Sequence, residues 1–310
     1  MYFFREVEKS IAKIYPEGDI RCPTHLSIGQ EAVPAAFSKI SNRNDFAVST
    51  HRGHLHYLAK GGNLNQFFSE LFGKENGCSS GKGGSMHLID LNVNFMGTSA
   101  ILGNSIPLGV GLGLSIKQKK QRLISTIFFG EGATEEGVFY ESLNFSALKK
   151  LPVLFICENN FYSVYSPLNV RQPKDRKIHK IAQTLGVKSK LNKSNDVISI
   201  YEDIDLAMKY IKKNKKPYFL EFETYRYIEH CGPNQDDNLG YRPLNEQKIW
   251  RKKDSLLKIE KYLLKNDKFF NIKKNKINKQ IDRLIIKSLD HASKSKEPKL
   301  SSAFMSPYAK

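Results

Sequence analysis

Two short apolar runs near the middle of the chain, each followed by small polar residues, constrain the fold more than any other feature of the sequence. The first run, residues 123–129, leads into Gly-Glu-Gly-Ala at positions 130–133, and the second, residues 152–158, leads into two asparagines. A segment with helical character separates the runs, so together they predict a βαβ unit. The carboxyl ends of both strands in such a unit open onto one edge of a parallel sheet. We therefore expect the Glu131 carboxylate and the Asn160 amide to face one crevice.

The rest of the chain continues this alternation of helices and strands. Helices are predicted at residues 1–14, 30–40, 63–72, 105–117, 134–148, 175–185 and 202–213, and strands at 45–50, 123–129, 153–157, 197–200 and 218–224. The pattern predicts an α/β fold with a doubly wound, mainly parallel sheet and a helical C-terminal tail. We expect residues 1–244 to form the α/β domain and residues 245–310 to form a basic helical extension packed on the same domain.

The predicted helix at residues 105–117 contains three glycines, Gly109, Gly111 and Gly113. Each glycine inside a helix costs about 1 kcal/mol relative to alanine. Close packing against neighbouring elements, or a subunit interface, is expected to offset that cost. Thr134 is predicted to cap the helix that follows the Gly-Glu-Gly-Ala motif.

Two segments are predicted to be loops. Residues 77–84 combine glycine, serine and lysine, and residues 227–241 are rich in Gly, Pro, Asn and Asp. Long irregular loops in compact domains are usually either functional or disordered. We therefore expect functional residues in or beside these loops.

Basic residues are concentrated at the C-terminal end. The formal net charge is +18, and residues 251–310 hold 17 Lys and Arg against 6 Asp and Glu. Such a tail suits nucleic acid, an anionic surface or an acidic protein, whereas apolar residues at helical spacing among the lysines favour solvated helix faces. The four widely spaced cysteines predict reduced thiols. No segment has the pattern of a signal, a transit peptide or a membrane-spanning helix, so we expect a cytoplasmic protein without membrane or nucleic-acid partners.

Oxygen ligands at two adjacent strand ends suit a magnesium ion, and glycines beside them let the backbone approach a phosphate. A Gly-Asp-Gly motif followed by two asparagines is the thiamine diphosphate fingerprint, and here Glu131 stands in place of the Asp. Four further segments accompany it in order: residues 25–32 (HLSIGQEA), 49–54 (STHRGH), 81–87 (GKGGSMH) and 224–230 (TYRYIEH).

With these segments the chain resembles the alpha subunit of the thiamine diphosphate-dependent 2-oxo-acid dehydrogenases, the decarboxylating component of the pyruvate, branched-chain and acetoin dehydrogenase complexes. The resemblance runs from about Cys22 to Arg242. It implies a thiamine diphosphate-binding fold, with thiamine diphosphate and Mg²⁺ as cofactors.

The resemblance also implies a metal shell. Glu131, Asn160 and the backbone carbonyl of Tyr162 would complete the magnesium coordination begun by two diphosphate oxygens. Because Glu131 is one methylene longer than Asp, it must fold back or admit a water molecule, and we expect weaker metal binding. The alternative is that Glu131 has left the metal shell.

Further cofactor contacts follow from the same resemblance. Arg52 would clamp the diphosphate with its planar fork. Leu102 would lie near the thiazolium ring, or serve only as a core residue. The complete set of implied cofactor contacts is His51, Arg52, Leu102, Gly130, Glu131, Gly132, Ala133, Asn160, Tyr162 and His230.

Two histidines are the implied catalytic residues. The counterpart of His230 lies on a loop at the active-site mouth, touches the diphosphate and assists acyl transfer to a lipoyl arm, while His25 reaches the cofactor region. After His230 the sequence departs from its relatives, which commonly continue with Ser, Met, Ser and Asp. Here Cys231 and a Gly-Pro-Asn run follow, and this divergence leaves the acyl acceptor open.

Thiamine chemistry also needs a carboxylate beside the aminopyrimidine ring, so that the ring can take a proton from C2. In the resembling family this glutamate belongs to a separate beta subunit. Glu31 lies in a segment that matches the alpha subunit, so it is not that group. We therefore expect an α2β2 heterotetramer that decarboxylates a small 2-oxo acid and passes the acyl group to a lipoyl-bearing acyltransferase.

Three alternatives stay open from the sequence. The first is a thiamine-dependent carboligase that transfers a two-carbon unit to an aldehyde or keto-sugar, prompted by the altered loop after His230. The second is a scaffold that has lost catalysis through the change at Glu131. The third is a nucleic-acid binder that uses the basic tail.

Overall fold

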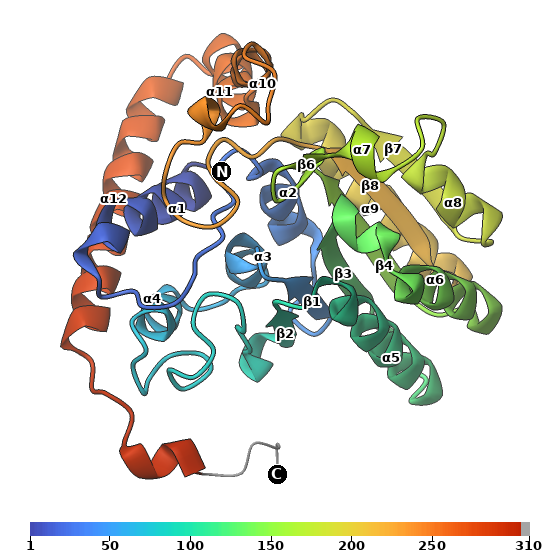
Figure 1. Cartoon of the computed structure of the whole chain (residues 1–310), viewed down its shortest axis with the longest axis horizontal. Coiled ribbons are helices and arrows are strands. Elements are labelled where there is room, and N and C mark those ends of the chain that lie inside the picture. The colour runs from blue at the N-terminus through green and yellow to red at the C-terminus, as the bar shows by residue number, and fades with distance from the viewer. Residues whose placement is uncertain (305–310) are drawn as a thin grey trace.

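The computed structural model describes residues 1–304, and within them six parallel strands form one sheet in the order β2-β1-β3-β4-β8-β7 (Figure 1). The strands are β1 (Phe46–Thr50), β2 (Phe95–Ser99), β3 (Ser125–Gly130), β4 (Val153–Asn159), β7 (Lys188–Asn192) and β8 (Tyr218–Glu223). A separate antiparallel hairpin pairs β5 (Tyr162–Ser163) with β6 (Ser166–Pro167). The prediction of an α/β fold with a mainly parallel sheet is confirmed.

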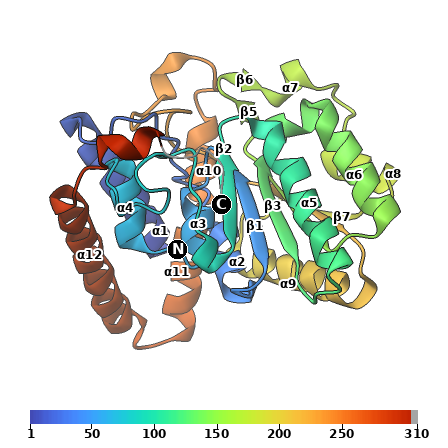
Figure 2. The same ribbon diagram turned by 90° about the horizontal axis from the view of Figure 1, so that it is seen from below.

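Helices cover both faces of the sheet, as Figure 2 shows. One face packs against α5 (Ser105–Gln118), α6 (Gly137–Lys149) and α8 (Ile178–Thr184). The other face shares a core with α1 (Tyr2–Ile14), α2 (Ala32–Ile40), α3 (His54–Ala59), α4 (Leu64–Leu71) and α9 (Val197–Asn214). The central strands β3 and β4 are buried from end to end except at Gly130, as expected for a parallel sheet covered on both sides.

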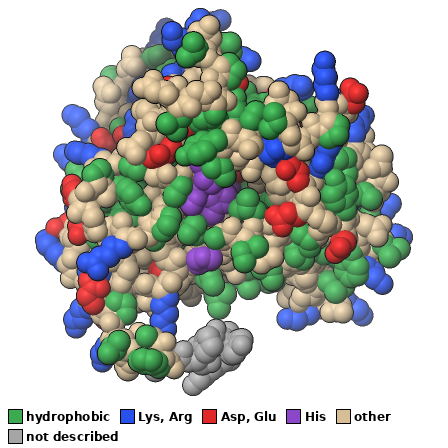
Figure 3. Space-filling model, viewed as in Figure 1, with side chains coloured by type: hydrophobic (Ala, Val, Ile, Leu, Met, Phe, Trp, Pro, Cys, Tyr) green, Lys and Arg blue, Asp and Glu red, His purple; other side chains and the backbone are tan. Residues whose placement is uncertain are grey.

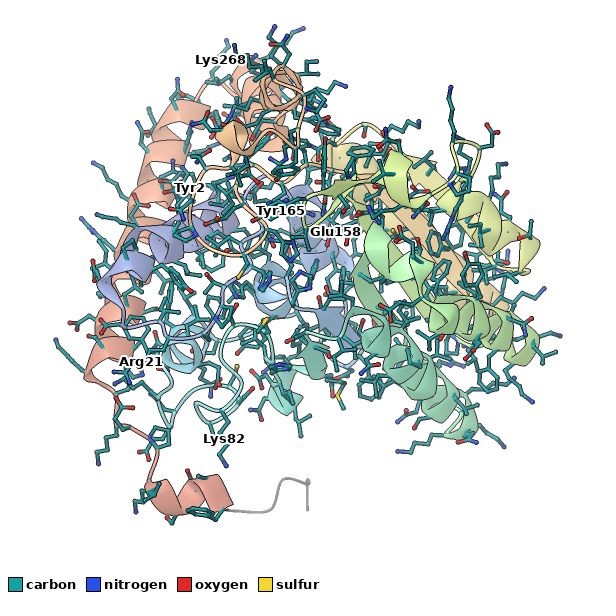
Figure 4. The ribbon with its side chains drawn as sticks, in the orientation of Figure 1. Tyr2, Arg21, Lys82, Glu158, Tyr165 and Lys268 are labelled. Carbon is teal, nitrogen blue, oxygen red and sulfur yellow. The ribbon has the colours of Figure 1, made fainter. Side chains whose placement is uncertain are left out.

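Three helices follow the sheet: α10 (Glu246–Lys252), α11 (Ser255–Asn266) and α12 (Phe270–Lys294). The long helix α12 packs against α1 and α4. Beyond it, Lys82 Nζ donates to the Ser302 carbonyl at 2.7 Å, which ties the C-terminal segment to the 77–84 loop (Figure 4). The helical tail is confirmed. Its division from the rest at residue 244 stays a prediction, and its last six residues, 305–310, lie outside the described part.

The predicted strand at residues 197–200 is wrong, because these residues begin α9. The side chain of Asp196 accepts hydrogen bonds from the backbone N–H groups of Ile198 and Ser199, which is a helix N-cap. The actual strand is β7, which ends five residues before the predicted strand begins. Its mostly polar sequence, Lys-Ser-Lys-Leu-Asn, suits an edge strand but hides the apolar alternation from which strands are predicted.

Thr134 does not cap a helix as predicted. It lies in a 3₁₀ turn, Glu131–Glu135, where its Oγ1 donates to the Glu131 carbonyl at 2.6 Å. Helix α6 begins only at Gly137. The motif after β3 therefore forms a compact turn that holds Glu131 at the strand end.

The glycines of α5 meet the sheet at close range. A Cβ at Gly109 would lie 2.3 Å from Ile127 Cγ1, and a Cβ at Gly113 would lie 2.4 Å from Val153 Cγ2. A Cβ at Gly111, in contrast, would meet no atom within 4 Å among the described residues outside its chain neighbours and the backbone of its own helix. Close packing thus explains two of the three glycines.

This difference predicts opposite effects of two alanine substitutions in one helix. Gly109→Ala should destabilise the protein by about 1–3 kcal/mol, because the added methyl overpacks a buried contact. Gly111→Ala should stabilise it by up to about 1 kcal/mol, because alanine is the better helix former. Denaturant unfolding of both variants checks the pair. A loss of stability at Gly111 would instead indicate that this face of α5 meets another subunit.

None of the helices formed by residues 1–304 combines the length and the apolar character that a membrane crossing requires.

Candidate functional site

The loops that follow four parallel strands meet at one edge of the sheet. His51 and Arg52 follow β1, Glu131 follows β3, Asn160 follows β4, and the segment leading to His230 follows β8. The pocket between them is lined by Gln30, Thr50, His51, Arg52, His56, Leu102, Phe129, Gly130, Glu131, Gly132, Ala133, Glu158, Asn160, Tyr162, Ser163 and His230. Figure 3 shows histidine side chains gathered in a hollow at the centre of this face.

Glu131 and Asn160 lie side by side in this pocket, as the βαβ prediction required. Gly130 at the end of β3 is in register with Glu158 on β4, so both loops leave the sheet at the same level. Burial raises the pKa of Glu131 to about 7, while the Arg171 guanidinium and the backbone N–H of Asn160 oppose the rise. The side chain of Asn160 accepts a hydrogen bond from the Tyr162 backbone N–H at 3.1 Å.

Arg52 is buried beneath the pocket and is held by backbone carbonyls rather than by a carboxylate. Its Nη1 donates to the Leu26 carbonyl at 2.6 Å, and its Nη2 donates to the His230 carbonyl at 3.1 Å. Burial, together with the charge of Arg226, lowers the pKa of Arg52 to about 9. A buried guanidinium with no carboxylate among its hydrogen-bond partners is well suited to bind an anion.

His25, His51 and His230 form a cluster in which one ligand atom from each lies within 4.8 Å of the others. His25 stands behind the pocket wall, with its ring 4.4 Å from that of His51 and 5.0 Å from that of His230. Both ring nitrogens of His51 and the Nδ1 of His25 are buried without a hydrogen-bond partner in the described residues. Three imidazoles at this spacing would suit a transition metal, but the nearby guanidiniums of Arg52 and Arg226 favour an anion instead.

These histidines are neutral in the folded protein. Burial is the main cause, and the charge of Arg52 adds to it, lowering the pKa of His25 to about 2, that of His230 to about 3 and that of His51 further still. The unfolded chain binds protons at these histidines below its ordinary pKa of about 6.5, whereas the folded chain does not.

Stability of the cofactor-free protein should therefore fall as the pH drops from about 6.5 toward 4. Replacing His230 with Asn should make this decline shallower, because one fewer proton is taken up on unfolding. Urea unfolding between pH 7.5 and 4.5 measures the slope. His87→Asn, at an exposed histidine, is the matched control and should leave the slope closer to that of the original chain than His230→Asn does.

The segment that carries His230 is anchored by a buried cluster of charged side chains. Arg226 Nη1 lies 3.3 Å from Asp236 Oδ2, and Arg242 Nη1 lies 3.1 Å from Asp236 Oδ1. The hydroxyl of Tyr241 donates to the same carboxylate. The predicted irregular loop at residues 227–241 is thus tied at both ends to one buried aspartate.

Two carboxylates near the site already have cationic or imidazole partners. Glu158, which Figure 4 labels near the centre of the molecule, lies 2.8 Å from the Nε2 of His56. Glu31 pairs with Arg5 and accepts a hydrogen bond from the Gly29 N–H at 2.9 Å. Glu31 is absent from the residues that line the pocket, in accord with the expectation that it is not the group needed beside an aminopyrimidine ring.

The glycine-rich loop at residues 77–84 does not offer its N–H groups to a ligand. The buried carboxylate of Glu70 accepts hydrogen bonds from the backbone N–H groups of Ser79, Gly81, Gly83 and Gly84 at 2.7–3.1 Å. The loop is therefore organised around an internal anion.

The residues of the pocket fit a metal-bound diphosphate. Arg52 and one ring nitrogen of the neutral His51 are donors for an anion, while Glu131 and Asn160 are oxygen ligands for a hard cation. A Cβ at Gly132 would lie 3.1 Å from Ser163 Oγ, so a larger residue there would require the serine side chain to shift by a few tenths of an ångström. The roles predicted from the sequence for the cofactor-binding and catalytic residues stay proposals. Of those residues, all except His25 line the pocket.

Sequence reasoning missed several residues of the site. Gln30 lies in the HLSIGQEA segment, but no role was predicted for it. His56 and Glu158 are far apart in the sequence, and no motif spacing connects them. Arg171 is the largest omission, because it forms an ion pair with Glu131 at 2.7 Å from 40 positions further along the chain. Only the fold brings the two together.

Comparison with known proteins gives a consistent result. The family model described as "Dehydrogenase E1 component" matches residues 1–301. The chain is similar to the pyruvate dehydrogenase E1 component subunit alpha of Rickettsia bellii, with 32% identity over 96% of this chain and 90% of that protein. It shares 35% identity with the same subunit of Rickettsia felis, over 86% of this chain and 80% of that protein. The chloroplastic subunit alpha-3 of Arabidopsis thaliana is 33% identical over 96% of this chain and 70% of that protein.

Proposed function

This chain belongs to the dehydrogenase E1 component family, and on that premise we propose that it works with a beta subunit to decarboxylate pyruvate, or a close 2-oxo acid, and to pass the acyl group to a lipoyl domain. Its family is thiamine diphosphate-dependent and typically uses Mg²⁺. The observation that carries the proposal is the convergence of Glu131, Asn160, Arg52 and His51 on one pocket at the carboxyl edge of the sheet.

Each group has a physical task in this proposal. When bound, thiamine diphosphate supplies the carbon nucleophile and the electron sink for loss of carbon dioxide. Arg52 and the neutral ring of His51 hold the diphosphate. Glu131, Asn160 and the Tyr162 carbonyl bind the magnesium ion that carries it.

His230 is proposed to donate a hydrogen bond at the mouth of the site. Its Nδ1 lies 3.4 Å from Arg52 Nη2. A guanidinium only donates, so Nδ1 is the acceptor and the neutral ring carries its hydrogen on Nε2. His25, packed against the His230 ring, holds that ring in place.

A beta subunit is proposed because the chain's own carboxylates at the pocket are engaged. Glu131 pairs with Arg171 and Glu158 pairs with His56. The carboxylate needed beside the aminopyrimidine must then come from another chain, which implies an α2β2 assembly. We further propose a cytoplasmic location, in keeping with the four free thiols found in the described part of the chain.

The lipoyl acceptor is proposed from the relatives, which are named as pyruvate dehydrogenase components. These similarities do not favour the carboligase alternative, and the chemistry of the pocket supports a cofactor site rather than a scaffold that has lost it.

The test is reconstitution with the beta subunit. The chain alone should show no 2-oxo acid decarboxylation, and the αβ complex with thiamine diphosphate and Mg²⁺ should reduce an artificial electron acceptor with pyruvate as donor. Mass spectrometry of an added lipoyl domain should then detect its acylation. Turnover that yields only carboligation products with added aldehydes would contradict the proposed acceptor, and failure of the complex to bind thiamine diphosphate would overturn the proposal.

A further inference from the structure

Glu131 forms an ion pair with an arginine, Arg171, that lies outside the Gly-Glu-Gly-Ala motif. Arg171 Nη2 lies 2.7 Å from Glu131 Oε1, and Arg171 Nη1 pairs with Glu135. The Glu131 residue is only 1% exposed. Arg171 therefore places a positive charge next to a carboxylate that is almost completely removed from water.

Arg171 is itself held from three directions. Besides its two carboxylate partners, its Nε donates to the Ser166 carbonyl of β6 at 3.1 Å. Glu135 is fixed in turn, because it accepts a hydrogen bond from Gln172 Nε2 at 2.8 Å. All three guanidinium nitrogens are engaged, so a rotation of Arg171 away from Glu131 would break hydrogen bonds to the hairpin and to the 3₁₀ turn.

The ion pair engages one oxygen of the Glu131 carboxylate, Oε1, and leaves Oε2 outside the pair. A glutamate has one more rotatable bond than the aspartate expected at this position, so its carboxylate needs an additional restraint to keep one orientation. Hydrogen bonds from surrounding residues are the usual means by which a metal-ligating carboxylate is oriented.

We propose that Arg171 is a positioning residue for the metal site: it fixes Glu131 through Oε1, so that Oε2 is presented to the magnesium ion that carries the diphosphate. The inference rests on the proposed function. In this arrangement Glu131 and Arg171 act as one unit, and the arginine compensates for the extra methylene.

The arrangement differs from simple competition between two cations for Glu131. A competing arginine would lower metal affinity, and its removal would tighten binding. A positioning arginine raises metal affinity, and its removal weakens binding. The sign of one measurement therefore separates the two.

The experiment measures Mn²⁺ binding to the αβ complex in saturating thiamine diphosphate, by electron paramagnetic resonance of free Mn²⁺, in a double-mutant cycle. Arg171→Gln should weaken Mn²⁺ binding about 10–100-fold. In the Glu131→Asp background the shorter side chain no longer depends on Arg171, so the same substitution should change affinity by less than about threefold. Arg176→Gln is the matched control, because Arg176 donates to the Thr134 carbonyl of the same turn without contacting Glu131.

Each outcome has a defined meaning. Unchanged or tighter Mn²⁺ binding by Arg171→Gln overturns the proposal, as does an equal loss in both backgrounds or an equal loss in Arg176→Gln. Thermal melts of the same complexes separate a lost contact from a lost fold, and Arg171→Lys serves as a second variant where Gln unfolds the chain. If the unaltered complex binds neither Mn²⁺ nor thiamine diphosphate, the proposed function itself fails, a result distinct from any failure of the cycle.

Discussion

Replacing Arg52 with glutamine is expected to weaken thiamine diphosphate binding by the αβ complex roughly 10²–10⁴-fold. The guanidinium is proposed to make two hydrogen bonds to a charged group, each worth about 1.5–3 kcal/mol. Glutamine keeps a donor but loses the charge and the planar fork. It also leaves the Leu26 and His230 carbonyls, which Arg52 now satisfies, without their partner. Calorimetric titration with the cofactor in excess Mg²⁺ measures the effect.

The matched control is Arg122→Gln, the same substitution at an exposed arginine between α5 and β3. It should leave cofactor affinity within about twofold. Urea unfolding without cofactor must accompany both variants, since Arg52 also joins two loops. An Arg52→Gln protein that is folded and binds the cofactor as tightly as the control would rule out the proposed diphosphate clamp.

Replacing Arg226 with methionine is expected to destabilise the protein by about 3–5 kcal/mol. Removal of one partner from a buried ion pair leaves an uncompensated charge. Arg226 is 1% exposed and also donates to the Val164 carbonyl and the Tyr241 hydroxyl at 3.2 Å. Arg242 remains next to Asp236, so the loss should lie toward the lower end. Because the cluster anchors the segment that carries His230, amide exchange at residues 227–241 should also rise.

Denaturant unfolding with hydrogen exchange tests this prediction. Arg43→Met, at an exposed arginine, should change stability by less than about 0.5 kcal/mol. The double variant Arg226→Met with Asp236→Asn should be less destabilised than the sum of its single variants. The reason is that the double variant removes both members of the Arg226–Asp236 ion pair, so that neither of these two charges is left without the other. Additive losses would show that the ion pair contributes little beyond packing.

The core of the site was predictable because its signals are local. The runs at residues 123–129 and 152–158 are mostly apolar, which is typical of strands covered on both faces. Parallel strands end at one edge of the sheet, so Glu131 and Asn160 had to meet once the βαβ unit was recognised. Errors arose where a local signal misled, as at residues 197–200, or where the strand was polar, as in β7.

Other features depend on partners far apart in the sequence. The Arg171–Glu131 pair, the Glu70 carboxylate beneath the glycine-rich loop and the Asp236 cluster each join groups whose meeting no local pattern indicates. The neutral state of His25 and His230 arises from burial beside Arg52, which exists only in the folded chain.

The sequence by itself determined strands β1, β3, β4 and β8, the edge at which the site lies and the family to which the chain is similar, because apolar runs and short motifs consist of neighbouring residues. The tertiary structure alone decided which charged side chains form ion pairs and which buried polar atoms have no hydrogen-bond partner among the described residues. Those properties depend on distance and on exclusion of water, and both are set only when distant segments pack together.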